Sequence, residues 1–234
     1  MYPSVETSID KIFAGDIAVT KGLKVPETDD VPLENGGKLI DATYLYADLA
    51  GSGRIANSLT KEAAAKVIKS YVNTSTRILR HNGGEIRSFD GDRVMAIFMG
   101  LDKEDRAVRA AMSINWAVEK VIPEAIKKHY TDPEVFPPIA HGVGIDSGEA
   151  LIIRGGIRNN NDLISIGAAP NVAAKLSDIR SPSKALFITD TVKEALSEEF
   201  LAFEGQSIWS VADWNYDVGG NHVRVWGSGA WWSV

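Results

Sequence analysis

The sequence has no cysteine among its 234 residues, which excludes disulfide bonds and thiolate metal sites. It also has no apolar run near the roughly 18 residues that a membrane-spanning helix needs. Residues 1–6 lack the basic start and apolar stretch of a signal peptide. Basic blocks are missing and the net charge is −6, which disfavours nucleic acid because phosphate neutralisation needs clustered Lys and Arg. These absences predict a cytoplasmic protein with no membrane segment and no nucleic-acid partner.

The composition is that of an ordinary globular chain, with 44% hydrophobic and 24% charged residues. Residues 1–38 contain a short amphipathic stretch and a polar connector with Pro and Gly, which predict a helical appendage and linker. Residues 39–228 form the predicted compact domain. Residues 229–234 form a tail, whose Trp231 and Trp232 we expect to pack against the same domain.

Apolar periodicity and turn residues predict the elements of this domain. Helices are expected at 60–80 with Thr60 as the N-cap, at 105–121 ending near Pro123, at 170–179 and at 191–196. Strands are expected at 38–49, 185–188 and 221–226, with hairpins pairing 85–87 with 94–98 and 139–145 with 149–154. This order predicts an α+β fold with a mostly antiparallel sheet flanked by helices.

Two carboxylates stand at the ends of predicted strands. Asp48 follows an apolar strand and precedes small residues, and Asp92 occupies the Asp90-Gly91-Asp92 turn. If the strands are neighbours, both carboxylates converge on one point and suit two hard cations that assist displacement at phosphorus. Asp before Gly is also a common turn residue, so the spacing alone leaves both interpretations open.

Five motifs occur in the order found in class III nucleotidyl cyclases. The segments that resemble this family are 45–51, 90–98, 107–111, 141–149 and 167–176, and they cover roughly residues 38–228. The resemblance implies the class III catalytic domain with its ferredoxin-like, palm-like core. It also implies a homodimer with two composite active sites acting on a nucleoside triphosphate with two divalent cations, Mn²⁺ or Mg²⁺.

The resemblance assigns a role to each matched position. Asp48, Asp92 and the Leu49 carbonyl would hold the metals in one protomer, and Ala50, Gly51, Ser52 and Gly53 would bind phosphates. The partner would supply Asn171 to orient the ribose and Lys175 to offset charge on the phosphates. The family has Arg at that last position, and Lys keeps the charge but loses the planar fork. The Lys that the family places before a Gly in its last hairpin is missing at Asp217–Gly220, and Arg54 is the candidate replacement.

The base-reading positions depart from the purine cyclases. Those enzymes use Lys or Glu four residues before the second metal Asp, and Asp or Cys three residues before the Gly that opens the Asn-bearing helix. Here the positions hold Ser88 and Ile164, and Ile cannot hydrogen-bond a base edge. Ser88 and Asp90 alternate along one strand and would face the same side.

This combination resembles the pyrimidine cyclases of bacterial anti-phage Pycsar systems. It implies cyclic UMP, or next cyclic CMP, as a messenger for a separate effector protein. Two alternatives stay open: a purine cyclase with an unusual pocket, and a silent nucleotide-binding cyclase-homology domain. A diguanylate cyclase is disfavoured because its Gly-Gly-Asp/Glu-Glu-Phe hairpin is missing. The activating signal, the effector, the working metal and the role of residues 1–38 are not readable from the sequence.

Overall fold

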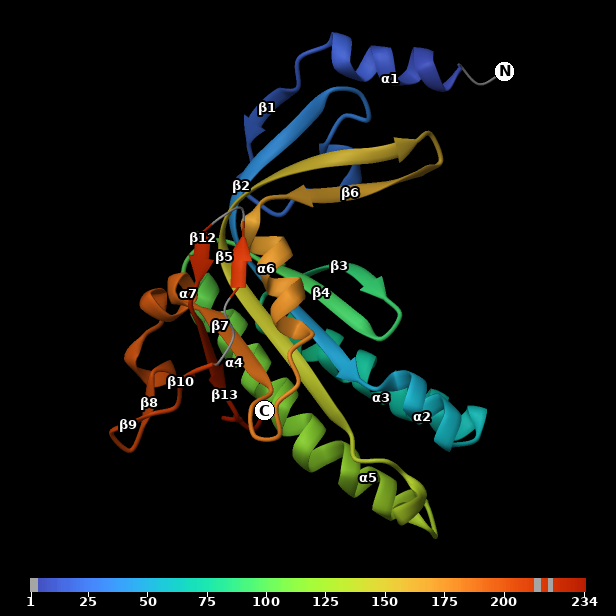
Figure 1. The fold of residues 1–234 in the computed structure, drawn as a ribbon, viewed down its shortest axis with the longest axis vertical. Helices are drawn as coiled ribbons and strands as arrows, with labels where there is room; N and C mark the ends of the chain where they lie inside the picture. Colours follow the sequence, from blue (N-terminus) through green and yellow to red (C-terminus); the bar gives the residue numbers. More distant parts are fainter. Residues whose placement is uncertain (1–3, 213–215, 219–220) are drawn as a thin grey trace.

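The computed structural model describes residues 4–212, 216–218 and 221–234, and it centres on one nine-stranded sheet (Figure 1). Seven strands run side by side in the order β10 (Ser210–Val211), β13 (Val225–Ser228), β7 (Leu186–Thr189), β5 (Ala140–Ile157), β2 (Gly36–Ala50), β4 (Arg93–Phe98) and β3 (Glu85–Asp90). Two more extend it: β1 (Ala18–Lys21) pairs with β2, and β6 (Asn160–Ile166) with β5. The pairs β1–β2 and β5–β7 are parallel and the others are antiparallel, so the predicted fold class is confirmed.

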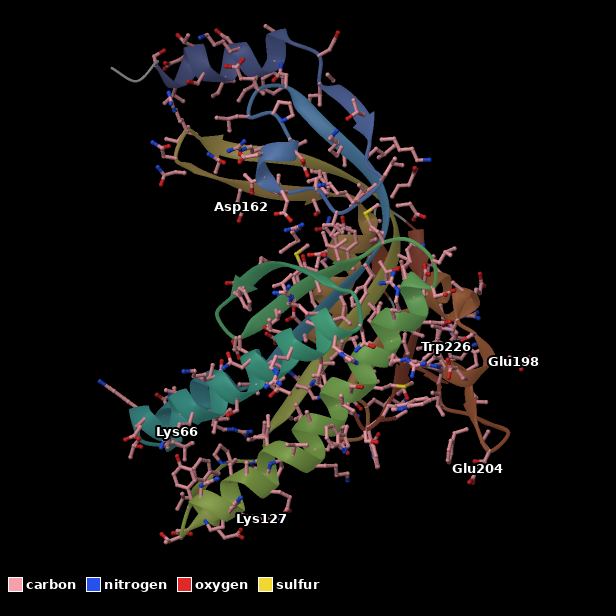
Figure 2. All side chains as sticks on the ribbon, turned by 180° about the vertical axis from the view of Figure 1, so that it is seen from behind. Lys66, Lys127, Asp162, Glu198, Glu204 and Trp226 are labelled. Atoms are coloured by element: carbon pink, nitrogen blue, oxygen red, sulfur yellow. The ribbon has the colours of Figure 1, made fainter. Side chains whose placement is uncertain are left out.

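Helices cover both faces of the sheet. The helices are α1 (Val5–Ala14), α2 (Ser52–Ser58), α3 (Lys61–His81), α4 (Lys103–Trp116), α5 (Ile122–His129), α6 (Ala168–Ser177) and α7 (Asp190–Ala195). Helix α6 lies in front of the sheet in Figure 1. Helices α3 and α4 cover the opposite face, which is turned toward the viewer in Figure 2. The short elements are η1 (Thr28–Asp30), η2 (Ala117–Val121), η3 (Pro133–Val135), η4 (Glu198–Phe200), and the hairpins β8 (Ala202–Phe203) with β9 (Gln206–Ser207) and β11 (Tyr216–Val218) with β12 (Asn221–Val223). None of the helices in the described ranges has the length and apolar character needed to cross a membrane.

Strand β2 divides its side chains between the two faces. Leu45, Ala47 and Leu49 are buried in the core under α3 and α4, whereas Ala42 and Tyr44 belong to the core under α6. Since successive side chains of a strand point to opposite faces, the even-numbered positions after Tyr44 share the α6 face. The alternation therefore assigns Asp48 to that face, at the end of β2.

Most of the predicted elements are confirmed, including Thr60, whose side chain caps α3 by accepting from Ala63 N. Residues N-terminal to 36 also contribute to the sheet and its core: β1 pairs with β2, and Val25 and Val31 are buried against the β2 face that carries Tyr44. The domain boundary at residue 38 stays a prediction. The tail packs on its own domain, as expected, with the Trp232 ring 6.0 Å from that of Phe200.

Three predicted boundaries are wrong. The expected hairpin of 139–145 with 149–154 is one strand, β5, whose hairpin partner is β6. Ser147 and Gly148 stay extended because they pair with Thr43 and Ala42 of β2. Pro123 does not end a helix: it lies in the first turn of α5, where a missing N–H is tolerated, and the π-helical η2 joins it to α4. The expected strand 221–226 is divided between β12 and β13.

Candidate active site

The structure brings Asp48 and Asp92 together at one end of the β2–β4 ladder. Ala47 pairs with Val94, so Asp48 lies beside Arg93 and the β3–β4 turn that carries Asp92. Gly91 forms that turn with a φ of 62°, a conformation that a residue with a Cβ rarely adopts. Burial raises the pKa of the Asp48 carboxyl, Arg93 and Arg180 act against this, and the charge of Asp92 raises it further. The two carboxylates therefore share one electrostatic environment.

Two arginines contact the Asp48 carboxylate, whose side chain is only 13% exposed. Arg93 Nε lies 3.4 Å from Asp48 Oδ1, and Arg180, which follows α6, donates to Oδ2. Arg180 is itself held by the Ser177 carbonyl at 2.5 Å, and Arg93 also bridges to Asp178. Neither arginine is among the predicted site residues.

The donor set fits hard divalent cations. Asp92 Oδ2 is buried and has no hydrogen-bond partner among the described residues, and the two arginines show that Asp48 attracts positive charge. Within the described ranges, no group of three or more His, Asp or Glu side chains could hold a metal. The remaining ligands would therefore be backbone, water and substrate oxygens, as is usual for Mg²⁺ with a nucleotide.

The expected phosphate-binding segment connects β2 to α2. Gly51 caps this short helix in the left-handed conformation, with φ 68° and ψ 35°, and its carbonyl accepts from Ile55 N. Leu49 buries its side chain in the core, while Arg54 is exposed on α2. The phosphate role of Ala50, Gly51, Ser52, Gly53 and Arg54 stays a prediction. Gly219 and Gly220, next to the position where the family has its lysine, lie outside the described residues.

A cavity of about 270 Å³ lies on the α6 face, beside the N-terminal segment. It brings together both expected base positions, Ser88 and Ile164, with Asn171. Its other lining residues are Val25, Pro26, Tyr46, Arg87, Met95, Ile97, Ile152, Asp162, Leu163, Ser165 and Pro170. Asp90 does not line the cavity; it is exposed and pairs with Arg93 at the end of the hairpin.

Close packing of α6 on β5 positions Asn171. A Cβ at Gly144 would collide with Ala173 O and Ser177 N, so this glycine lets the helix approach the sheet. Asn171 Nδ2 donates to the Gly167 carbonyl at 2.9 Å, which fixes the amide at the start of α6. Asn171 and Lys175 lie four residues apart, on one exposed face of the helix.

The site of one chain thus has two separate parts. The carboxylate part holds Asp48 and Asp92, and the cavity part holds Ser88, Ile164 and Asn171; no residue of 48–54 lines the cavity. Tyr46 and Arg87 also line the cavity, and neither is among the predicted site residues. Only the folded register of β3 brings Arg87 there. Tyr46 had a readable signal, since it lies two residues before Asp48 on the same strand face.

His141 has a structural role. Its Nε2 lies 2.9 Å from Asn115 Oδ1, and it is buried beside Tyr71. Asn115 Nδ2 donates to the carbonyls of Gly229 and Ala230, so Asn115 Oδ1 is the acceptor and His141 is protonated at Nε2. Burial, with help from Arg180, lowers the pKa of His141 to about 3.

The fold is that of the class III nucleotidyl cyclase catalytic domains. The guanylyl cyclase Cya2 superposes with a TM-score of 0.65 over 83% of this chain and 94% of that one, at 22% identity. No family model matches the sequence.

Two sequence relatives are much more similar. A protein of Rhodovulum sp. (strain MB263) named uridylate cyclase is 40% identical over 230 residues, which cover 97% of this chain and 95% of the relative. A second uridylate cyclase, from Xanthomonas perforans, is 38% identical over 205 residues, 87% of each chain. At this identity and coverage, the chain belongs to the same family of class III nucleotidyl cyclases as these uridylate cyclases.

Proposed function

We propose that this chain is a uridylate cyclase that converts UTP into 3′,5′-cyclic UMP and pyrophosphate, with CTP as the next substrate. The cavity that joins Ser88, Ile164 and Asn171 carries the proposal. Neither Ser88 nor Ile164 offers the Lys, Glu, Asp or Cys side chain with which purine cyclases read their base. The relatives named uridylate cyclase support the same substrate.

Cyclisation requires the ribose 3′-oxygen to attack the α-phosphorus while pyrophosphate leaves and the hydroxyl proton passes to solvent. Asp48, Asp92 and the Leu49 carbonyl would hold two Mn²⁺ or Mg²⁺ ions. Such ions, when bound, lower the pKa of the attacking hydroxyl and neutralise phosphate charge. Residues 50–54 would bind the phosphates, Asn171 would orient the ribose for attack, and Lys175 would offset the charge that develops on the transferred group.

The complete site would form between two protomers. One chain offers a base and ribose cavity that none of residues 48–54 lines, so a nucleotide in this cavity needs its carboxylates from elsewhere. A head-to-tail homodimer would place the Asp48 and Asp92 of one protomer opposite the Asn171 and Lys175 of its partner. Each dimer would then contain two composite sites.

The product would act as a second messenger in the cytoplasm. A cyclic pyrimidine nucleotide would activate a separate effector protein, and we propose that the pair serves in defence against phage. The resemblance to Pycsar cyclases supports this role.

The test is to incubate the purified protein with each of ATP, GTP, CTP and UTP plus Mn²⁺ and identify cyclic products by mass. Cyclic UMP as the main product is the expected result. Cyclic AMP or cyclic GMP alone would overturn the pyrimidine assignment but keep the family's chemistry. No product from any nucleotide would favour a silent nucleotide-binding domain.

A further inference from the structure

The cavity contains a β-bulge that changes which side chains face the nucleotide. Strand β3 pairs Ile86 with Ala96 and then Ser88 with Met95, so Arg87 is an extra residue opposite this step of β4. On a regular strand, neighbouring side chains point to opposite faces. At a bulge they need not, and both Arg87 and Ser88 line the cavity. The bulge thus adds a cation next to a position that purine cyclases use to read the base.

The N-terminal segment holds this cation in place. Glu27 accepts from both terminal nitrogens of Arg87, with Nη1–Oε2 at 3.2 Å and Nη2–Oε1 at 3.1 Å. Val25 and Pro26, just before Glu27, line the same cavity. A bidentate pair of this kind fixes the plane of the guanidinium group. Residues 25–27 therefore help to build the pocket wall.

Arg87 retains one donor that the protein does not use. Its side chain is 16% exposed, and its Nε is buried without a hydrogen-bond partner among the described residues. Buried donors in folded proteins nearly always have an acceptor, so a free one beside a cavity points to a ligand acceptor. Arg87 can only donate, because a guanidinium group has no acceptor.

We infer that Arg87 reads the C4 carbonyl of uracil and so makes the enzyme prefer UTP over CTP, an inference that rests on the proposed function. Uracil presents a carbonyl oxygen at C4, where cytosine presents an amino group. A side chain that can only donate forms a hydrogen bond with the carbonyl oxygen of uracil. It forms none with the amino group of cytosine, which presents two donors of its own. Glu27 is a positioning residue that acts through Arg87.

The test compares kcat/KM for UTP and CTP in Arg87→Met and in the matched control Arg154→Met. Arg154 is also paired with the N-terminal segment, through Asp29 at 3.2 Å, and its side chain is 20% exposed, but it does not line this cavity. We expect Arg87→Met to lower kcat/KM for UTP by about 10- to 100-fold with little change for CTP. Arg154→Met should leave the UTP/CTP ratio at the wild-type value. An equal loss for both nucleotides in Arg87→Met would overturn the inference while the proposed function stands.

Two further variants separate base reading from folding. Arg87→Gln supplies both a donor and an acceptor, so kcat/KM for CTP should rise relative to kcat/KM for UTP. The variant should melt at the wild-type temperature. Glu27→Gln should raise KM for UTP more than it lowers kcat, since the guanidinium group stays but is less fixed. An unchanged UTP/CTP ratio in Arg87→Gln would overturn the inference.

If the wild-type protein cyclises no nucleotide, the proposed function fails, and binding of UMP and CMP measured by calorimetry tests Arg87 independently. A wild-type preference for UMP that Arg87→Met abolishes would support the role. Equal affinity of the wild-type protein for both would overturn it.

Discussion

Arg93 Nε lies 3.4 Å from Asp48 Oδ1, so the carboxylate expected to bind metal already faces a cation of its own chain. Arg180 contacts the other oxygen of the same carboxylate. Both contacts are long-range: Asp48 and Arg180 are separated by 132 positions in the sequence. The arginines balance the charge of a carboxylate that is mostly buried, and a metal ion bound at Asp48 would also balance part of this charge.

Removal of Arg180 should make the protein more dependent on metal. In Arg180→Gln the Asp48 carboxylate loses one cationic partner, and we expect the free energy of unfolding in EDTA to fall by about 1 kcal/mol, since Arg180 is partly exposed. Adding Mn²⁺ should raise the melting temperature more in this variant than in the wild-type protein. If Mn²⁺ raises the melting temperature equally in both proteins, as measured by thermal unfolding, a metal ion does not replace Arg180 as the partner of Asp48.

Asp92→Asn should separate catalysis from stability. Asp92 Oδ2 has no hydrogen-bond partner among the described residues. Replacing this carboxylate by an amide therefore breaks no described hydrogen bond at that atom, but it removes the charge that a metal ion needs. We expect turnover to fall by more than the roughly 10- to 100-fold typical for loss of an outer-shell partner of a metal. The melting temperature should stay level or rise.

Asp41→Asn is the matched control for that variant. Asp41 is an exposed carboxylate on β2 that pairs with Lys103 of α4, away from the α6 face. Its turnover should equal that of the wild-type protein. Substantial turnover in Asp92→Asn with Mn²⁺ would contradict the assignment of Asp92 as a metal ligand.

Complementation tests whether sites are shared between protomers. Asp92→Ala and Lys175→Ala are each expected to be inactive as homodimers, because every site lacks one part. A mixed dimer has one site that lacks both parts and one that lacks neither, so activity should return when the two variants are co-expressed with different tags and purified together. No recovery in a verified mixed dimer would contradict composite sites.

The sequence predicts the parts of the fold that depend on local patterns. The β-branched and aromatic composition of β2 and the Thr60 cap of α3 are both local signals. The turn composition of Ser147-Gly148 predicts a hairpin within 139–154, and only pairing with β2 keeps these two residues of β5 extended. Tertiary pairing here overrides local preference.

The candidate site likewise contains residues that the sequence predicts and residues that only the fold reveals. Asp48, Asp92 and Asn171 stand in short motifs and could be named from the sequence. Arg87 is different, because its role depends on a bulge against β4 and on Glu27, 60 positions away. No local pattern encodes either relationship.

Asp146 should make stability fall as the pH rises. It is buried, accepts from Thr189 Oγ1 at 2.6 Å, and burial raises its pKa from 3.8 to about 6. The folded state thus binds the proton more tightly than the unfolded state, and this stabilisation is lost as the pH rises through 6. Between pH 4.5 and 7 the loss should be about 2 kcal/mol, absent in Asp146→Asn. Urea unfolding of both proteins at the two pH values measures the difference; a constant difference would contradict the raised pKa.

His141 should act with the opposite sign. Its pKa is lowered from 6.5 to about 3 by burial first and by Arg180 second, so the unfolded chain binds the proton more readily in this range. The stabilisation is therefore complete above pH 6.5 and is lost as the pH falls, by about 2 kcal/mol at pH 5.

His141→Gln keeps a donor for Asn115 Oδ1 but cannot titrate. We expect its free energy of unfolding to change less than that of the wild-type protein between pH 7 and pH 5, with the gap between the two curves narrowing by about 2 kcal/mol. Because Asp146 compensates in the wild-type protein, the measurement is best made in the Asp146→Asn background. Parallel curves with and without His141 would mean that the buried imidazole takes up its proton without unfolding.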